Sequence, residues 1–321
     1  MRAIQVSEHG GPEVLRYVEV PDPQAGRGQL LVRTQASGIN FIDTYIRTGR
    51  YPQAVPYIPG SEGTGVVTAV GPEVTEFRVG DRVAWAAAPA GYAEQVVVPA
   101  AVAIPVPDGV GAPVAASALL QGMTAHYLIE SIYRPEPGES VLVHAGAGGV
   151  GLILTQLLAA RGVRVITTVS TDDKEKLSRD AGAAEVLRYD EDIAARVREL
   201  TDGAGVAAAY DGVGASTFES SLAATRIRGT VALFGAASGP VPPFDLQRLN
   251  PLGSLFVTRP TLAHYTRDHA ELLWRAGDIM NAIADGTLHI RIGGSYPLAQ
   301  AEQAHRDLEG RRTTGSIVLV P

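Results

Sequence analysis

A glycine-rich stretch near the middle of the chain has the residue types and spacing of a phosphate-binding loop. Residues 144–151 have the sequence HAGAGGVG, in which Gly146, Gly148 and Gly151 match the pattern G-x-G-x-x-G. The stretch follows an apolar, strand-like segment and opens an Ala- and Leu-rich helical segment, which is the context that makes this pattern informative. Glycine lets the backbone approach a pyrophosphate, and a helix N-terminus offers free N–H groups and a partial positive charge. The stretch therefore predicts a dinucleotide site, although a purely structural glycine turn is the alternative.

The residues about 20 positions beyond the loop predict which dinucleotide binds there. An NAD site usually carries an acidic residue at the end of the second strand, whereas this chain has Ser170 followed by Thr171. Neither side chain repels a 2′-phosphate. Lys174 lies one helical turn further on and could pair with that phosphate, and Tyr189, after the third strand, could flank the same pocket. We therefore expect NADPH as the cofactor.

Two aspartates complicate this prediction. Asp172 or Asp173 could contact the ribose if the strand ends later than expected. We favour a different role, in which Asp172 and Glu175, three residues apart, form a helix-capping pattern. For Lys174 the alternative is a solvated lysine on the helix surface.

The segments around the glycine loop alternate between strand-like and helix-like patterns. Such alternation requires crossover connections and predicts a mainly parallel, doubly wound sheet. The expected strands are residues 141–143, 163–169, 185–187, 206–210, 230–234 and 254–258.

The two ends of the chain have other patterns. The first third has short β-branched segments bounded by Gly, Pro or Asp, including residues 30–34, 65–70 and 94–98, and one short helix beginning near Asn40. Irregular β structure with many turns suits a barrel-like domain. Along the tail we expect a helix over 270–285, a strand around 289–292, a helix over 298–308 and a closing strand over 316–320. We expect this tail to return to the first domain.

Composition bounds the class of protein. The chain has 321 residues, no cysteine and a formal net charge of −7. A length in this range usually means two domains. The acidic balance, without a cluster of Lys and Arg, argues against nucleic-acid and anionic-membrane partners. No apolar run approaches the ~20 residues of a membrane span. The N-terminus looks like a short strand rather than a signal peptide, so we expect a cytoplasmic protein.

Several stretches together carry a resemblance to a known family. They occur in the family's order and spacing over nearly the whole chain, and they are residues 38–47 (GINFIDTYIR), 60–65 (GSEGTG), 80–83 (GDRV), 145–151, 210–214 (YDGVG) and 253–260 (GSLFVTRP). The chain resembles the zinc-free medium-chain dehydrogenases/reductases, and most closely the NADPH:quinone oxidoreductases of the zeta-crystallin type.

The resemblance implies an α/β architecture. A GroES-like, β-rich substrate domain would be formed by residues 1–124 and 265–321, around a Rossmann dinucleotide-binding domain of residues 125–264. It also implies a homodimer, in which edge strands of the two cofactor domains pair. The expected edge is Gly253 to Thr258, and burial by a second copy would protect an apolar edge strand from aggregation.

The zinc ligands of related dehydrogenases have no counterpart in this sequence. Where zinc-dependent relatives have a catalytic cysteine and histidine, this chain has Asn40 and Ser61. The four-cysteine lobe of those relatives is also missing between Arg82 and Tyr92. We expect no bound metal.

The resemblance further implies reduction of a quinone by NADPH. A quinone accepts hydride readily, so the protein mainly positions the reactants and excludes water. Asn40 and Tyr45 would donate to the acceptor oxygen, and Tyr51 would line the same cleft, although either tyrosine could simply pack. An enone or enoyl C=C reductase is the alternative enzyme, and a non-catalytic structural or RNA-binding role is the alternative outside catalysis. Cofactor contacts carried over by matching position are Asn40, Asp43, Tyr45, Thr124, Gly149, Val150, Gly151, Phe234, Gly235, Val257, Thr258, Arg259 and Arg311.

Overall fold

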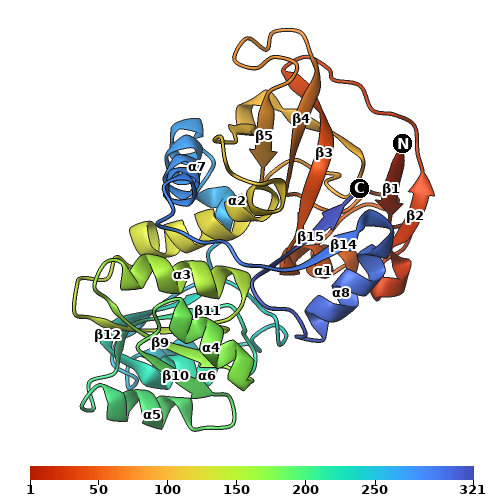
Figure 1. Ribbon diagram of the computed structural model, residues 1–321. Coiled ribbons are helices and arrows are strands. Elements are labelled where there is room, and N and C mark those ends of the chain that lie inside the picture. The colour runs from red at the N-terminus through yellow and green to blue at the C-terminus, as the bar shows by residue number, and fades with distance from the viewer. The chain divides into compact units, whose positions relative to one another are not determined.

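The computed structural model describes all residues, 1–321, and the chain divides into two compact units (Figure 1). Unit 1 comprises residues 1–121 and 268–321, and unit 2 comprises residues 122–267. No helix combines the length and the apolar character that crossing a lipid bilayer requires.

Unit 2 is built on a six-stranded sheet in the order β10-β9-β8-β11-β12-β13. Every neighbouring pair is parallel. The strands are β8 (Ser140–Val143), β9 (Arg164–Val169), β10 (Glu185–Arg188), β11 (Val206–Asp211), β12 (Thr225–Leu233) and β13 (Phe256–Thr258). The doubly wound parallel sheet expected from the sequence is confirmed.

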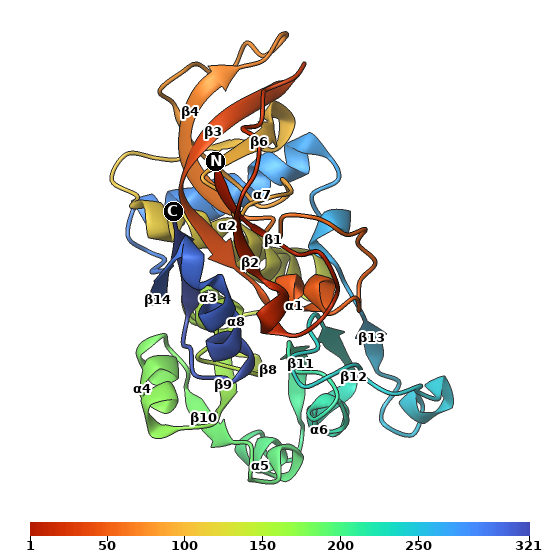
Figure 2. The same ribbon diagram turned by 90° about the vertical axis from the view of Figure 1, so that its right-hand side faces the viewer.

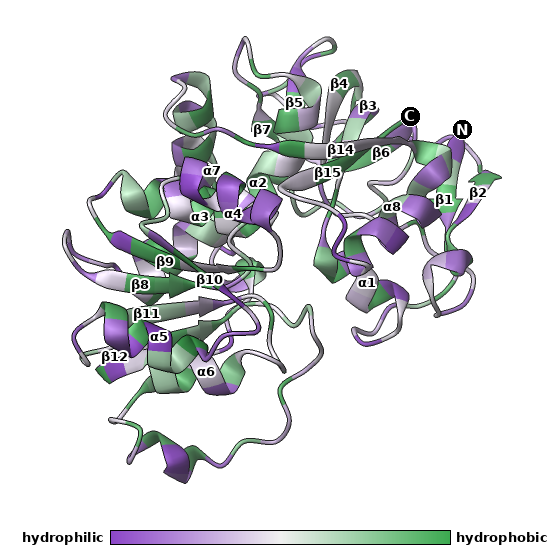
Figure 3. Cartoon of the chain, turned by 60° about the horizontal axis from the view of Figure 1, so that its bottom comes forward, coloured by the Kyte–Doolittle hydropathy of each residue, from purple (hydrophilic) through white to green (hydrophobic).

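Helices cover both faces of this sheet. α3 (Gly149–Ala159) and α4 (Asp172–Asp180) lie on one face, and α5 (Ile193–Leu200) and α6 (Phe218–Ala224) lie on the other (Figure 3). Because both faces are covered, all six residues of β11 are buried. This packing holds the carboxyl ends of the strands, and the loops that follow them, in fixed positions.

Unit 1 is mainly antiparallel and contains a seven-stranded sheet in the order β14-β15-β3-β4-β5-β7, with β6 pairing with β3. A separate two-stranded sheet joins β1 and β2. The strands are β1 (Arg2–Gln5), β2 (Arg16–Glu19), β3 (Gln29–Ile39), β4 (Gly63–Val70), β5 (Arg82–Trp85), β6 (Gln95–Pro99), β7 (Ile104–Pro105), β14 (Ile292–Pro297) and β15 (Ser316–Val320). This β-rich arrangement agrees with the barrel-like domain expected from the sequence.

Both ends of the chain contribute to unit 1, as the two terminus labels in Figure 2 show. The closing strand β15 pairs antiparallel with β3. One hydrophobic cluster accordingly joins Ile4 and Ile39 from the first part of the chain with Leu298 and Leu319 from the tail. The tail therefore returns to the first domain, as expected.

Four longer helices complete the chain. α1 (Phe41–Arg47), α7 (His269–Ala284) and α8 (Ala301–Glu309) belong to unit 1. α2 (Ala112–Tyr127) begins in unit 1, ends in unit 2 and continues into a π-helical turn, Leu128–Ile132. Short 3₁₀ turns lie at Pro12–Val14, Ala100–Val102, Leu246–Leu249, Leu262–His264 and Leu298–Gln300.

One expected strand is displaced. The sequence predicts a strand around 289–292, but β14 begins only at Ile292 and has the sequence IGGSYP. Glycine has a low strand propensity, so its presence at positions 293 and 294 conceals this strand from a pattern search. The position of this strand is set by its pairing with β15, in which Ile292 lies opposite Ser316.

Candidate active site

The glycine loop of unit 2 forms a tight turn after β8. Ala145 adopts a left-handed conformation with φ of 56°. The Gly146 amide donates to the Thr168 carbonyl at 2.9 Å, and the Gly148 amide donates to the Ala145 carbonyl at 2.9 Å. A Cβ on Gly151 would lie 2.2 Å from the Ala145 oxygen. The fold of the loop itself therefore requires glycine at this position.

The loop leads directly into the N-terminus of α3. Gly148 is the N-cap residue and supplies no side-chain cap. The amides of Gly149, Val150 and Gly151 stand in the first helical turn, where N–H groups have no partner within the helix. A Cβ built on Gly148 meets only Ala145, with its oxygen 3.2 Å away, so the backbone is open to an approaching group on that side. Free amides and the positive end of the helix dipole fit a pyrophosphate.

Two of the residues expected to select NADPH lie together at the carboxyl end of β9. The Nζ atom of Lys174 is 3.3 Å from Oγ of Ser170. The capping role expected for Asp172 is wrong, because Thr171 is the N-cap residue of α4 and its hydroxyl accepts the Lys174 amide at 3.3 Å. Asp172 instead pairs with Arg188 at 2.6 Å. Threonine is also a preferred capping residue, so α4 is capped one residue earlier than expected.

Tyr189 contacts the glycine loop directly. β10 runs beside β9 with Arg188 opposite Val169, so Tyr189 and Ser170 leave adjacent strand ends. The Tyr189 hydroxyl accepts the Ala145 amide at 2.9 Å. Its ring stacks on His144 with centroids 6.3 Å apart. The serine, the tyrosine and the loop thus share one edge of the sheet.

The remaining expected cofactor residues of unit 2 lie further along the sheet or in α2. Phe234 and Gly235 directly follow β12, and a Cβ on Gly235 would lie 2.3 Å from the Gly212 oxygen. Val257 and Thr258 belong to β13, which Arg259 follows directly. Thr124 is buried in α2.

A buried polar network that the sequence did not reveal supports the glycine loop. Asp211, at the end of β11, accepts the amides of Val213 and Gly214 at 2.8 and 2.9 Å and the Ser221 hydroxyl at 2.8 Å. The same serine lies 3.1 Å from Nε2 of His144, the residue that precedes the loop. Burial lowers the pKa of His144, which keeps its imidazole neutral. The sequence predicted no role for His144. Its hydrogen bond to Ser221 indicates that it supports the loop that follows it.

The donor candidate Asn40 of unit 1 is held at both ends of its carboxamide. Nδ2 donates to Oε2 of Glu62 at 2.7 Å, and Oδ1 accepts from Nε2 of Gln121 at 3.1 Å. Gln121 in turn accepts the Ser316 hydroxyl at 2.7 Å. No sequence pattern indicated the Gln121 and Ser316 contacts, because they join residues 81 and 195 positions apart.

Asn40 also links two buried carboxyl groups. Its backbone amide donates to Oδ2 of Asp43 at 2.8 Å, which closes the first turn of α1. Burial raises the pKa of Asp43 to about 6, against the lowering effect of its hydrogen bonds. Burial also raises the pKa of Glu62 to about 8, although the Leu120 amide and Asn40 donate to it. A Cβ on Gly38 would lie 2.7 Å from Oε2 of Glu62, so the strand that delivers Asn40 needs glycine there.

The two tyrosine candidates form one aromatic group at the other end of α1. The rings of Tyr45 and Tyr51 meet edge to face, with centroids 5.7 Å apart. The guanidinium of Arg50 lies over the Tyr45 ring at 4.7 Å. Tyr45 is buried and Tyr51 is exposed. Arg311, the last expected residue of unit 1, is exposed two residues after the end of α8 and has a left-handed φ of 57°.

No group of three or more His, Cys, Asp or Glu side chains is arranged to hold a metal ion. At the position that corresponds to a zinc ligand, Asn40 is instead hydrogen-bonded to Glu62 and Gln121.

Comparisons with known proteins agree with these features. The family model for the alcohol dehydrogenase GroES-like domain matches residues 26–108, and the model for the zinc-binding dehydrogenase matches residues 149–271. A curated quinone oxidoreductase of Pseudomonas aeruginosa is 45% identical, covering 100% of this chain and 99% of its own length. Quinone oxidoreductase 1 of Escherichia coli is 40% identical, covering 99% of both chains.

Solved structures give the same result. A mycobacterial structure complexed with NADPH has a TM-score of 0.98 and 57% identity, with complete coverage of both chains. The Escherichia coli quinone oxidoreductase complexed with NADPH has a TM-score of 0.98 and 39% identity, again with complete coverage. The chain belongs to the medium-chain dehydrogenase/reductase superfamily and, within it, to the quinone oxidoreductase family.

Proposed function

We propose that the protein is an NADPH-dependent quinone oxidoreductase that works without a metal. The observation that carries this proposal is the pairing of Lys174 with Ser170 at the end of β9, beside the open glycine loop. A lysine and a hydroxyl at this place suit a 2′-phosphate. The relatives named quinone oxidoreductases support the same reaction, and one of them, that of Escherichia coli, is solved in complex with NADPH. The similar mycobacterial structure also contains NADPH.

Bound NADPH would supply a hydride from its nicotinamide. In the proposed arrangement, unit 2 holds the cofactor. The amides of Gly149, Val150 and Gly151 bind the pyrophosphate after the turn made by Gly146 and Gly148. Ser170, Lys174 and Tyr189 surround the 2′-phosphate. Further proposed cofactor contacts are Asn40, Asp43, Tyr45, Thr124, Phe234, Gly235, Val257, Thr258, Arg259 and Arg311.

Unit 1 carries the residues proposed to act on the acceptor. Asn40, Tyr45 and Tyr51 are the proposed donors to the acceptor oxygen, where negative charge develops as hydride arrives. Asn40 donates one hydrogen of Nδ2 to Glu62, so the second hydrogen of that nitrogen is the one proposed to serve the acceptor. We propose residues 1–124 and 265–321 as the substrate domain and residues 125–264 as the cofactor domain.

A second candidate reaction is reduction of an activated C=C bond. It is favoured by a 2-haloacrylate reductase of Burkholderia that is 39% identical over 99% of this chain. Following NADPH oxidation with benzoquinone, phenanthrenequinone, an enone and an enoyl thioester separates the two. Turnover of the quinones is expected, whereas turnover of the thioester alone would replace the quinone assignment.

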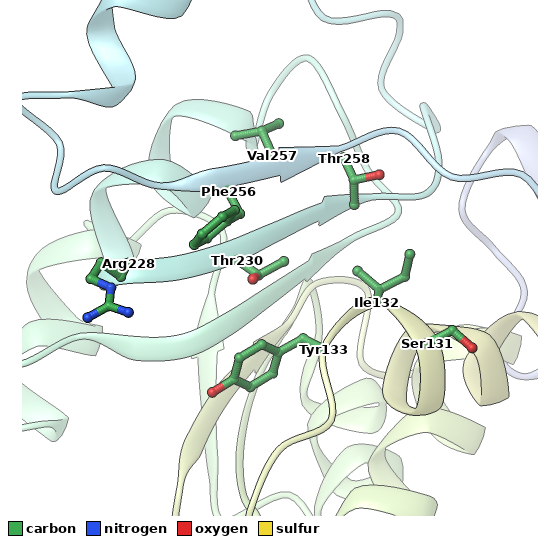
Figure 4. A pocket seen from close by; sticks show the side chains of 8 residues that line it. All are labelled: Ser131, Ile132, Tyr133, Arg228, Thr230, Phe256, Val257 and Thr258. Carbon is green, nitrogen blue, oxygen red and sulfur yellow. The ribbon is translucent and has the colours of Figure 1, made fainter.

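We also propose that the protein is a cytoplasmic homodimer formed through β13, which is an edge strand of its sheet. Phe256 on this strand is 62% exposed and Ile227 is 73% exposed, and large apolar side chains exposed at a sheet edge favour an interface. A hollow of about 470 Å³ lies beside the strand. Figure 4 shows the residues that line it, which are Ser131, Ile132, Tyr133, Arg228, Thr230, Phe256, Val257 and Thr258. Sedimentation and cell fractionation test the two statements.

A further inference from the structure

A chain of buried hydrogen bonds in unit 1 connects α8 to the N-terminus of α1. At its far end, Nη1 of Arg47 lies 2.9 Å from Nδ1 of His305. Arg47 is held in place by the Gly10 carbonyl at 3.1 Å and by Glu309 at 2.7 Å. Arg47 and His305 are fully buried, although they belong to helices from opposite ends of the sequence.

The arginine fixes the direction of this chain. A guanidinium has only donors, so Nδ1 of His305 must accept, and the ring proton must reside on Nε2. Burial lowers the pKa of His305 to about 3, and the charge of Arg47 acts in the same direction. The histidine is therefore neutral over the physiological range and has a single tautomer.

The histidine then orients Tyr92. Nε2 of His305 lies 3.2 Å from the Tyr92 hydroxyl, so its N–H donates to the phenolic oxygen. The Tyr92 O–H is thereby directed to Oδ2 of Asp43, at 2.8 Å. The same carboxylate oxygen accepts the backbone amide of Asn40 at 2.8 Å. Arg47, His305 and Tyr92 thus form one directed series of donors that ends at the Asp43 carboxylate. That carboxylate also accepts from Asn40, the residue proposed to face the acceptor.

We propose that His305 and Tyr92 are positioning residues for the reaction: they direct a hydrogen bond onto Asp43, which holds the first turn of α1 and thereby the donor Asn40. This inference rests on the proposed function. Neither residue needs to touch the substrate or the cofactor. Both act through the Asp43 carboxylate, because an ionised carboxylate accepts hydrogen bonds more strongly than a neutral acid.

The charge of Asp43 makes the proposal testable by pH. Tyr92 lowers the pKa of Asp43 by donating to it, so loss of that hydroxyl raises the pKa further. The other groups that face Asp43 are Tyr57, Glu62 and Arg47. Burial raises the pKa of Tyr57 to about 12, so it stays neutral. Burial raises the pKa of Glu62 to about 8, and the Asp43 charge adds to this, so Glu62 is mostly protonated in the acid range.

The experiment is the pH profile of kcat/KM for Tyr92→Phe with NADPH and benzoquinone. The wild type is expected to lose activity as Asp43 becomes protonated near pH 6. Removing one charge-assisted hydrogen bond should move that midpoint up by about one pH unit. kcat/KM should then fall about fivefold at pH 6 and scarcely change at pH 8. A profile of unchanged shape in the folded variant would overturn the proposal.

Two further variants of unit 1 complete the test. Tyr296→Phe deletes a similar tyrosine-to-aspartate bond, that of Tyr296 with Asp307 at 3.0 Å, away from α1, and should leave the acid limb unmoved. His305→Leu removes both hydrogen bonds of the imidazole. It should move the acid midpoint of the kcat/KM profile upward, as Tyr92→Phe does. His305→Gln keeps a donor and an acceptor and should restore much of the profile. Equal profiles for the leucine and glutamine variants would contradict the directed series.

The titration of Asp43 can also be followed without activity, by carboxyl carbon NMR of the wild type and of Tyr92→Phe. An upward shift of the Asp43 midpoint in the variant supports the hydrogen-bond series, and an unchanged midpoint overturns it. A wild type that fails to oxidise NADPH with any quinone would refute the proposed function, while the NMR result would still decide whether Tyr92 sets the charge of Asp43.

Discussion

The ammonium group of Lys174 lies 3.3 Å from the hydroxyl of Ser170, at the strand end where NAD-dependent relatives of this fold usually carry an acid. The serine takes away the negative charge that would repel a 2′-phosphate, and the lysine adds a positive one. The two residues therefore act in the same direction on cofactor choice.

Replacing Lys174 by alanine should weaken NADPH binding roughly tenfold and leave NADH binding nearly unchanged. The reason is that only NADPH carries the phosphate that the ammonium would contact. Dissociation constants of both cofactors, measured by fluorescence titration, check this. Lys176→Ala is the matched control, since Lys176 pairs with Asp180 on the same helix. Equal losses for NADH and NADPH would show that Lys174 does not read the phosphate.

Alanine substitutions at two glycines of the loop should have different effects, one on stability and the other on cofactor binding. A Cβ on Gly146 would lie 2.6 Å from Cβ of Thr167 and 2.7 Å from Oγ of Ser178, both buried. Gly146→Ala should therefore cost about 1–3 kcal/mol of unfolding free energy. A Cβ on Gly148 has only the Ala145 oxygen nearby, at 3.2 Å. Gly148→Ala should remain closer to wild-type stability but weaken NADPH roughly tenfold or more, because its methyl occupies the approach to the pyrophosphate.

Urea unfolding and cofactor titration on the two alanine variants measure these effects. The prediction fails if Gly148→Ala binds NADPH normally, or if Gly146→Ala is as stable as the wild type.

The aspartate at the end of β11 should be a stability residue. Asp211 accepts hydrogen bonds from two backbone amides and from the hydroxyls of Thr217 and Ser221. Its side chain therefore acts only as an acceptor at this place. Asp211→Asn turns an amide nitrogen toward these donors and should lower the free energy of unfolding by about 2–4 kcal/mol. Asp190→Asn, on an exposed loop, is the control. Urea denaturation followed by circular dichroism measures both, and similar midpoints for the two variants would count against the role given to Asp211.

Local sequence signals were sufficient for much of unit 2. The apolar strands, the glycine pattern and the alternation with helices each act over short distances, and they predicted the parallel sheet and the loop between β8 and α3. Ser170 and Lys174 could be assigned to the same 2′-phosphate site in advance because they are only four positions apart, and the structure brings their side chains together. The start of α1 near Asn40 was also predictable from its capping residue.

Contacts between distant parts of the chain were not predictable in this way. Arg47 and His305 are 258 positions apart, and each looks like an ordinary residue of a surface helix in the sequence. The glycines of β14 hide a strand whose place depends on β15. In both cases tertiary packing decides the outcome, and a single sequence carries no periodic signal of it.

Glu62 should make unit 1 less stable as the solution becomes more alkaline. Burial raises its pKa from 4.5 to about 8, so the folded state binds the proton more tightly than the unfolded state does. Its contribution to stability is therefore fully present below about pH 4.5 and is lost as the pH rises through 8.

Between pH 6 and pH 8 this loss should amount to about 2 kcal/mol. Glu62→Gln has no proton to lose and should show a flatter dependence over the same interval. Urea unfolding of both proteins at several pH values measures the difference, and parallel curves would mean that Glu62 does not titrate in this range. Glu76→Gln, at an exposed carboxylate, should keep the wild-type slope.

The exposed edge of unit 2 gives a test of the proposed dimer. Phe256 is 62% exposed on β13, the last strand of the sheet, and a charge at this position would have to be buried if a second copy pairs there. Phe256→Asp should therefore shift the protein from dimer to monomer, because an unpaired buried carboxylate costs several kcal/mol. Val79→Asp introduces the same charge at an exposed apolar residue of unit 1 and should leave the assembly unchanged. Sedimentation velocity of the three proteins at matched concentration measures the outcome. A Phe256→Asp variant that sediments as the wild-type dimer would place the interface elsewhere, because burying an unpaired carboxylate in the interface would be too costly for the dimer to form.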